Sequence, residues 1–212
     1  MENLKKGISH AAVLMTVTLF LISGTLTAQD YKLLQQAFKD SYTYENNGEY
    51  TRAAEVIRKH YDESSYEINL RLGWVLYKAG QFTESSSYYQ RAINLKPYAI
   101  EARLGLTYPA TSLGQNELVK NQYIEILKIA PEYTLVNYKL GLLYYQREDY
   151  ANALKYFEKV VNLFPFDYDS VLMFAWTQFR LGKLREAKVL FNKVLLISPN
   201  DKSALEGISL IK

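Results

Sequence analysis

Residues 134–167, TLVNYKLGLLYYQREDYANALKYFEKVVNLFPFD, are the stretch that decides the fold of this chain. Leucine, alanine and aromatic residues stand at helical spacing in both halves, with landmarks at Leu140, Gly141, Tyr144, Ala153, Phe157 and Pro165. Such spacing indicates side chains that share one face of a helix. The stretch therefore predicts two successive helices, with Glu148 in the turn between them and Pro165 after the second.

The landmarks return at a fixed period. Four of the five prolines are 34 residues apart: Pro97, Pro131, Pro165 and Pro199. A glycine stands seventeen positions earlier in three of the four cases: Gly80, Gly114 and Gly182. Glycine suits a tight turn between helices, and proline cannot continue a helix because it lacks the backbone N–H. The period predicts helix pairs at about 34–65, 66–99, 100–133, 134–167 and 168–201, followed by a lone helix at 202–212.

These landmarks resemble the tetratricopeptide repeat, whose pattern is a Leu-Gly pair and a tyrosine in helix A, an alanine and an aromatic residue in helix B, and a closing proline. The unit 168–201 repeats the pattern with Phe174, Ala175, Ala187, Phe191 and Pro199. The units 66–99 and 100–133 keep much of it, and 34–65 is shorter and more divergent. The resemblance covers residues 29–212 and implies an all-α, right-handed α-solenoid of about five helix pairs with a C-terminal capping helix.

The first 28 residues differ from the rest of the chain. Lys5 and Lys6 precede an uncharged, largely apolar run from Ala11 to Ile22, and small residues lead to Ala28. This order is typical of a secretory signal peptide, residues 1–28, and the alternative is an uncleaved membrane anchor. Because the strongly apolar core is short, we favour cleavage. Residues 29–212 would then be exported from a bacterial cytoplasm, as a periplasmic or secreted protein without an integral membrane span.

Composition argues against several classes of function. The chain has 25 Lys and Arg against 22 Asp and Glu, so it lacks the basic excess of a nucleic-acid-binding protein. It has no cysteine, which excludes disulfides and cysteine ligands for a metal. His60 is the only histidine outside the N-terminal segment, and we expect it to pack within the first unit. With no phosphate loop, HExxH or dinucleotide fingerprint, the sequence predicts no enzyme, no cofactor and no metal site.

Most repeat positions have a structural explanation. Small residues should let helix A approach helix B closely, and they are Gly73, Thr107, Gly141 and Ala175. The aromatic residue of helix B should fill the groove between units, at Tyr89, Tyr123, Phe157 and Phe191. Thr134, Asp167 and Asp201 stand where a helix needs an N-cap oxygen. We expect all of these side chains to serve packing and capping.

In the tetratricopeptide family the A helices line the concave surface of the solenoid. The resemblance therefore implies a peptide-binding groove lined by aromatic residues: Phe38, Tyr42, Trp74, Tyr77, Tyr108, Tyr138, Tyr145, Trp176 and Phe179. The second position of three units is acidic, at Glu67, Glu101 and Asp169. Family members that clamp a C-terminal carboxylate use Lys and Asn where this chain has Phe38 and Tyr42, so that clamp is not expected.

Three alternatives remain open for the aromatic residues: they bind a peptide or protein segment, they bind a glycan, or they pack against one another. Tyr and Trp are common anchors at protein interfaces, which favours the first alternative. We therefore expect a scaffold or adaptor with a protein or peptide partner in the bacterial envelope. A glycan-binding, polysaccharide-associated accessory protein is the alternative function.

Two features depart from the repeat pattern. Pro109 lies inside helix A of the third unit, where it removes the hydrogen bond to the carbonyl of Gly105, and we expect a kink or a break there. The C-terminal helix is apolar at Leu205, Ile208, Leu210 and Ile211, although a terminal cap usually turns a polar face outward. This helix either packs on the fifth unit alone or also supports self-association with a second copy.

Overall fold

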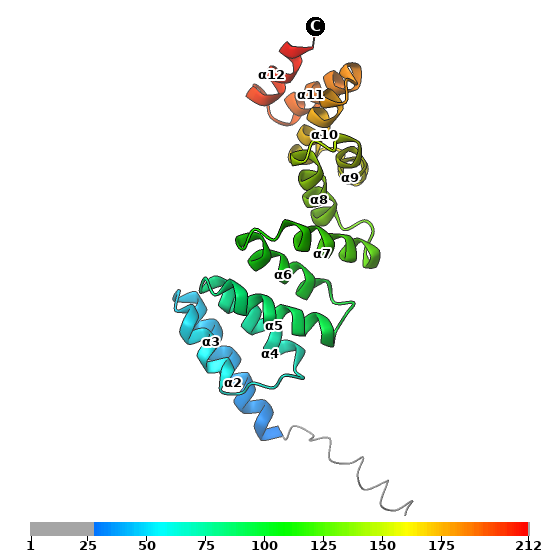
Figure 1. The fold of residues 1–212 in the computed structure, drawn as a ribbon. Helices are drawn as coiled ribbons and strands as arrows, with labels where there is room; N and C mark the ends of the chain where they lie inside the picture. The colour runs from blue at the N-terminus through cyan, green and yellow to red at the C-terminus, as the bar shows by residue number, and fades with distance from the viewer. Residues whose placement is uncertain (1–27, 212) are drawn as a thin grey trace, which may run out of the picture. The chain divides into compact units, whose positions relative to one another are not determined.

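The structure is a computed structural model that describes residues 28–211, and over that range all of its regular elements are α-helices (Figure 1). The predicted signal peptide lies outside the described residues apart from its last position, Ala28. The chain divides into two compact units, residues 1–60 and 61–212, and each is described by itself.

The described part of the first unit is one helix pair. Helix α2 (Ala28–Asn46) packs against α3 (Tyr50–Arg58). The buried hydroxyl of Ser41 donates a 2.9 Å hydrogen bond to the carbonyl of Ala53, which ties the two helices together. His60 lies in the turn after α3 and is exposed, so the prediction that it packs inside the pair is wrong. The reason is that α3 ends at Arg58, before the chain reaches the histidine.

The second unit repeats with the period of the sequence. Its A helices have 13 residues each and are α4 (Tyr66–Lys78), α6 (Ile100–Ser112), α8 (Thr134–Gln146) and α10 (Tyr168–Arg180). Its B helices have 14 residues each and are α5 (Phe82–Leu95), α7 (Asn116–Ile129), α9 (Tyr150–Leu163) and α11 (Leu184–Ile197). Helix α12 (Lys202–Leu210) follows, and every helix packs on the next one along the chain. Residues 34 apart therefore occupy equivalent places in this unit.

The turns between A and B helices need a left-handed residue. The φ angles of Gly80, Gly114 and Gly182 are 77°, 69° and 74°, which confirms the role predicted for these glycines. Glu148 takes the same conformation, with a φ of 60°, although a side chain makes it costly.

Aromatic rings of the B helices fill the space left by small residues on the A helices. A Cβ built on Gly73 would lie 2.9 Å from the ring of Tyr89, and one built on Gly105, in the next unit, would lie 2.1 Å from it. A Cβ built on Gly141 would lie 2.7 Å from the ring of Phe157. The predicted roles of Gly73, Gly141, Tyr89 and Phe157 in close helix packing are thus confirmed.

Two of the three predicted caps are confirmed. Asp167 accepts a hydrogen bond from the N–H of Ser170, and Asp201 accepts one from the N–H of Ala204. Thr134 is not a cap, because it is already the first residue of α8 and Tyr133 precedes the helix. Tyr133 has no oxygen within reach of the free amides, and it makes no side-chain cap hydrogen bond.

Of the kink or break predicted at Pro109, the break is absent, because α6 continues through the buried proline to Ser112. A kink stays a prediction. Side-chain hydrogen bonds flank the site: Thr107 Oγ1 donates to the carbonyl of Leu104, and Thr111 Oγ1 donates to the carbonyl of Thr107, both at 2.7 Å. Beyond the proline, the N–H of Leu113 still reaches the Pro109 carbonyl at 3.0 Å. The helix thus continues across one missing backbone donor.

Candidate functional site

Three of the predicted binding residues gather on two successive A helices. The ring centroids of Tyr77 and Tyr108 are 5.4 Å apart in a stacked arrangement, and Trp74 lies 6.0 Å from Tyr108 and 5.9 Å from Tyr77. We call Trp74, Tyr77 and Tyr108 the aromatic cluster. Tyr108 is 46% exposed, and the other two rings are half-buried. The cluster therefore combines rings held by mutual contact with an accessible surface.

Residues around the aromatic cluster support it. Phe82 of α5 lies 5.9 Å from Tyr77, and the ammonium of Lys78 lies 5.6 Å from the Trp74 ring centroid. A cation near the face of an indole is attracted by the ring's negative quadrupole. These contacts limit the number of conformations that Trp74 and Tyr77 can take, so the two side chains have little conformational entropy left to lose.

The aromatic residues farther along the chain are more involved in internal packing. Tyr145 lies 5.2 Å from Tyr150 of α9, and interaction with the Tyr145 hydroxyl raises the pKa of the Arg180 guanidinium of α10. Phe179 is half-buried and lies 5.5 Å from Trp176.

Trp176 is mainly a packing residue. Its ring centroid lies 5.0 Å from that of buried Phe191, and its Nε1–H donates a 2.9 Å hydrogen bond to Ser203 Oγ of α12. Ile208 and Ile211 also pack on this C-terminal core, whereas Leu205 and Leu210 are about half exposed. The packing of α12 on the fifth unit is thus observed, and self-association stays a prediction.

Two predicted residues belong to the other compact unit. Phe38 is half-buried and Tyr42 is exposed on α2, with their ring centroids 6.5 Å apart. They form a pair of their own, and their part in binding stays a prediction.

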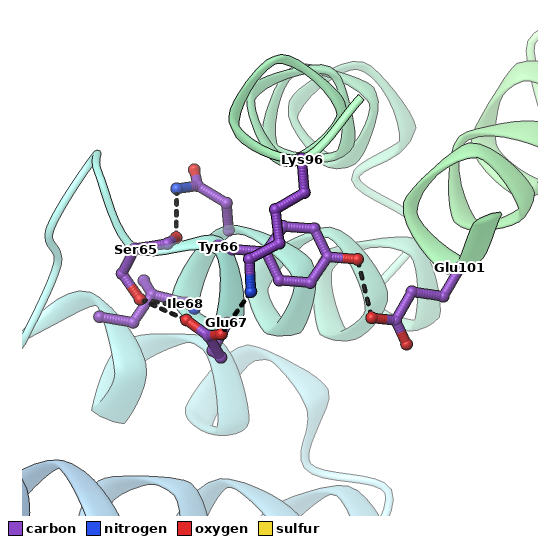
Figure 2. A network of polar contacts seen from close by, with 7 residues as sticks. Ser65, Tyr66, Glu67, Ile68, Lys96 and Glu101 are labelled. Carbon is purple, nitrogen blue, oxygen red and sulfur yellow. Dashed lines mark hydrogen bonds and ion pairs between the residues drawn. The ribbon is translucent and has the colours of Figure 1, made fainter. Parts of the chain in front are cut away.

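A network of polar groups surrounds Tyr66 at the start of α4 (Figure 2). The Tyr66 hydroxyl donates a 2.8 Å hydrogen bond to Glu101, and the Lys96 ammonium lies 4.3 Å above the Tyr66 ring centroid. Lys96 also pairs with Glu67 at 3.0 Å. Burial, and next the bond to Glu101, raise the pKa of the Tyr66 phenol. Two of the three acidic second positions, Glu67 and Glu101, are exposed but thus already pair with side chains of the same protein.

The third acidic residue, Asp169, borders an open hollow of about 350 Å³. Its lining comes from α8, from the end of α9 and from the start of α10: Thr134, Leu135, Tyr138, Val160, Phe164, Asp167, Asp169 and Ser170. Tyr138 packs on Phe157 with a centroid distance of 5.8 Å. Burial raises the pKa of Tyr138, and the charges of Asp169 and Asp167 raise it further. The hollow thus has an apolar floor and two carboxylates at its rim.

No cluster of three or more potential metal ligands occurs within the part of the chain that the structure describes. Among the described helices, none is both long enough and apolar enough to cross a membrane.

Comparison with known proteins places the chain. A model of the tetratricopeptide repeat matches residues 41–100 and 117–168, and a second such model matches residues 144–208. The chain belongs to the tetratricopeptide-repeat family. A curated relative is the TPR repeat-containing protein YpiA of Bacillus subtilis (strain 168), 22% identical over 211 residues. The match takes in 93% of this chain and 50% of YpiA, so the chain spans about half the length of the curated relative it matches.

Solved structures of tetratricopeptide-repeat proteins share the fold. A tetratricopeptide repeat protein from Parabacteroides merdae ATCC 43184 has a TM-score of 0.72 at 23% identity, covering 85% of this chain and 72% of that one. A MamA protein gives a TM-score of 0.69 at 18% identity, over 78% and 92% of the two chains. MamA from Desulfovibrio magneticus RS-1 gives 0.68 at 16% identity, over 84% and 99%. The predicted all-helical tetratricopeptide solenoid is confirmed.

Sequence reasoning assigned Tyr138 and Asp169 to an aromatic groove with an acidic edge, but it did not predict the hollow that these residues line. The sequence did contain a signal for the hollow. The first position of the repeat is a tyrosine at Tyr66 and Tyr168 but the smaller Thr134 in the repeat 134–167. Finding the hollow required comparing the first position of one unit with the second position of the next, a relation that becomes evident from the Tyr66–Glu101 contact.

Proposed function

We propose that this protein is a non-enzymatic scaffold or adaptor that binds a peptide or protein segment on its aromatic cluster. The observation that carries the proposal is the exposure of Tyr108 in contact with Trp74 and Tyr77. Rings that serve only the core of this fold are covered, as Tyr89 is at 2% exposure. Three adjoining rings that stay accessible give a partner a large apolar contact area.

The physical properties of these rings suit peptide binding. Tyrosine and tryptophan have few rotatable bonds, and their contacts with Phe82 and with each other already restrain them. Each ring offers apolar area together with one polar group that can pair with a peptide backbone. Side chains of this kind supply much of the binding energy at protein interfaces.

The proposed location is the bacterial envelope. Support comes from the order of basic, apolar and small residues over positions 1–28, which is the order of an export signal. The partner would then be another exported or envelope protein.

Affinity capture from envelope fractions tests the proposal. The bait is residues 29–212 as wild type, as Tyr108→Ser, and as Tyr98→Ser for a control. Tyr98 is 83% exposed and stands outside the aromatic cluster. We expect mass spectrometry to identify a partner that wild type and Tyr98→Ser retain and that Tyr108→Ser loses.

A partner retained equally by Tyr108→Ser would remove the aromatic cluster from the proposal. Capture that survives protease treatment of the fraction but disappears after glycosidase treatment would replace the protein partner with a glycan.

A further inference from the structure

The hollow at Thr134 has an occupied counterpart two repeats earlier. Counting back two repeats, Thr134 corresponds to Tyr66, Leu135 to Glu67, Phe164 to Lys96 and Asp169 to Glu101. These four counterparts are the residues of the polar network in Figure 2. One unit thus fills this place with its own side chains, and the other leaves a hollow of about 350 Å³.

Backbone geometry supports the equivalence. Helices α4 and α8 begin at Tyr66 and Thr134, and α5 and α9 end immediately before Lys96 and Phe164. The φ and ψ angles are −131° and 80° at Lys96, and −127° and 75° at Phe164. The side chains of Lys96 and Phe164 therefore leave equivalent backbones in equivalent directions.

In two repeats a tyrosine occupies this place and bonds a carboxylate at the N-terminal end of the first helix after its own pair. Tyr66 is 5% exposed and donates its hydroxyl to Glu101 at 2.8 Å. Tyr168 donates its hydroxyl to Asp201 Oδ2 at 2.7 Å. The site at the start of helix A is thus built for a phenol whose hydroxyl meets a carboxylate.

The unit that begins at Thr134 keeps both acceptors but has no phenol. Asp169 is the counterpart of Glu101, and Asp167 is the counterpart of Asp201. Asp167 accepts the N–H of Ser170, whereas Asp169 makes no hydrogen bond or ion pair with any residue in the described range. The threonine side chain is too short to fill the volume of a tyrosine ring.

The unit that begins at Ile100 provides an internal control. Its first position is Ile100 and the second position of the next unit is Leu135, so neither a phenol nor an acceptor is present. In the other complete repeats of the second compact unit, which begin at Tyr66, Ile100 and Tyr168, the phenol and the carboxylate are therefore either both present or both absent. Among the complete repeats of the second compact unit, only the one that begins at Thr134 has the acceptor without the donor.

We propose that the hollow binds a tyrosine side chain of the partner, with its ring against Phe164 and Tyr138 and its hydroxyl donating to Asp169. This inference rests on the proposed function as a peptide-binding scaffold and specifies one residue that the bound segment carries. Phe164 is 54% exposed and offers a ring face where Lys96 offers a cation in the counterpart. The two carboxylates favour a neutral hydroxyl donor and repel a phosphorylated tyrosine.

Titration with single amino-acid amides tests the inference without the unknown partner. The probes are N-acetyl-tyrosine amide and N-acetyl-phenylalanine amide, followed by chemical-shift changes in residues 134–170. We expect saturable shifts with the tyrosine probe, and binding about tenfold weaker with the phenylalanine probe, because a hydrogen bond to a charged acceptor is lost. Equal affinity of the two probes, or no saturable shift with either, would overturn the inference.

Two variants locate the binding. Thr134→Tyr should fill the hollow with the protein's own ring, raise the melting temperature and abolish probe binding. Asp169→Asn should leave the fold unchanged and reduce the preference for tyrosine over phenylalanine. If Thr134→Tyr is folded and binds the tyrosine probe as wild type does, the probe lies elsewhere and the inference is wrong. Should Thr134→Tyr fail to fold, an Asp169→Asn variant with undiminished preference overturns it equally.

The tyrosine site and the proposed scaffold function can fail independently of each other. If the tyrosine probe binds but Tyr108→Ser captures the same partners as wild type, the hollow is supported as a tyrosine site and the aromatic cluster is excluded as the binding surface. If Tyr108→Ser loses a partner but the tyrosine probe does not bind, the scaffold function is supported and the hollow is excluded as a tyrosine site.

Discussion

Gly105 of α6 lies against the ring of Tyr89 of α5 so closely that an added Cβ would sit 2.1 Å from Cε1 of that ring. The same ring also lies against Gly73, on helix A of its own repeat. Tyr89 is therefore held between two A helices, and the spacing of successive units depends on residues without side chains at these positions.

Replacing Gly105 with Ala should lower the free energy of unfolding by about 1–3 kcal/mol, because an overpacked core must shift to accept the methyl group. Chemical denaturation of the wild type, of Gly105→Ala, of Tyr89→Leu and of the double variant forms a double-mutant cycle. The alanine should cost much less in the Tyr89→Leu background. An equal cost in both backgrounds would show that the ring is not the obstacle.

Replacing Glu148 with Gly should raise the free energy of unfolding by about 0.5–1 kcal/mol. Glu148 has a φ of 60°, a conformation that glycine adopts without the strain of a Cβ. The matched control is Glu148→Ala, which also removes the carboxylate but keeps the Cβ and should give no gain. A similar gain from both variants would assign the effect to charge.

Replacing Asp201 with Ala should cost about 1 kcal/mol, because α12 loses its N-cap oxygen. Hydrogen bonds from the Ala204 N–H and the Tyr168 hydroxyl lower the pKa of Asp201 from its usual value of 3.8. The contribution of the charged Asp201 carboxylate to the free energy of unfolding is therefore fully present above about pH 4. It is lost as the pH falls through the lower pKa that this group has in the folded state. Melting temperatures measured between pH 2 and pH 7 should converge for wild type and Asp201→Ala at the acid end. The control Asp201→Asn keeps a cap oxygen and should lose the acid dependence at this position.

Replacing Trp176 with Ser should lower stability far more than replacing Tyr108 with Ser. Trp176 packs on Phe191 and holds Ser203, and truncating such a ring costs about 3–5 kcal/mol. Tyr108 is 46% exposed, so we expect a cost of about 1 kcal/mol or less. Denaturation midpoints by circular dichroism measure both. Comparable losses would mean that Tyr108 belongs to the core, which would contradict its assignment to a binding surface.

The period of the prolines and glycines predicted the helix pairs well because those residues act locally, through a missing N–H or a left-handed turn. Local reasoning also found the caps at Asp167 and Asp201. It failed at Thr134, where the helix begins one residue earlier than a threonine cap requires. At Pro109 the helix continues past one lost hydrogen bond, so no break occurs, and a kink there stays a prediction.

The candidate site was less predictable because it depends on contacts between units. Trp74 and Trp176 occupy the same position of their repeats, so the sequence does not distinguish them. In the structure Trp74 contacts Tyr108, whereas Trp176 packs on Phe191 and hydrogen-bonds α12. The hollow arises where the first residue of a repeat is too small to reach the side chains at the start of the next repeat. Only the packed structure shows which residues of two successive repeats meet in this way.

Site-specific photo-crosslinking tests the central claim most directly, namely that the aromatic cluster is a surface for a protein partner. A photoreactive phenylalanine analogue is placed at position 108, and at position 98 as a control of greater exposure, in cells of the organism that encodes the chain. We predict a discrete crosslinked protein at position 108 that is absent at position 98 and is lost when Trp74 is replaced by Ser in the same chain. No protein adduct at position 108, or the same adducts at both positions, would contradict the claim.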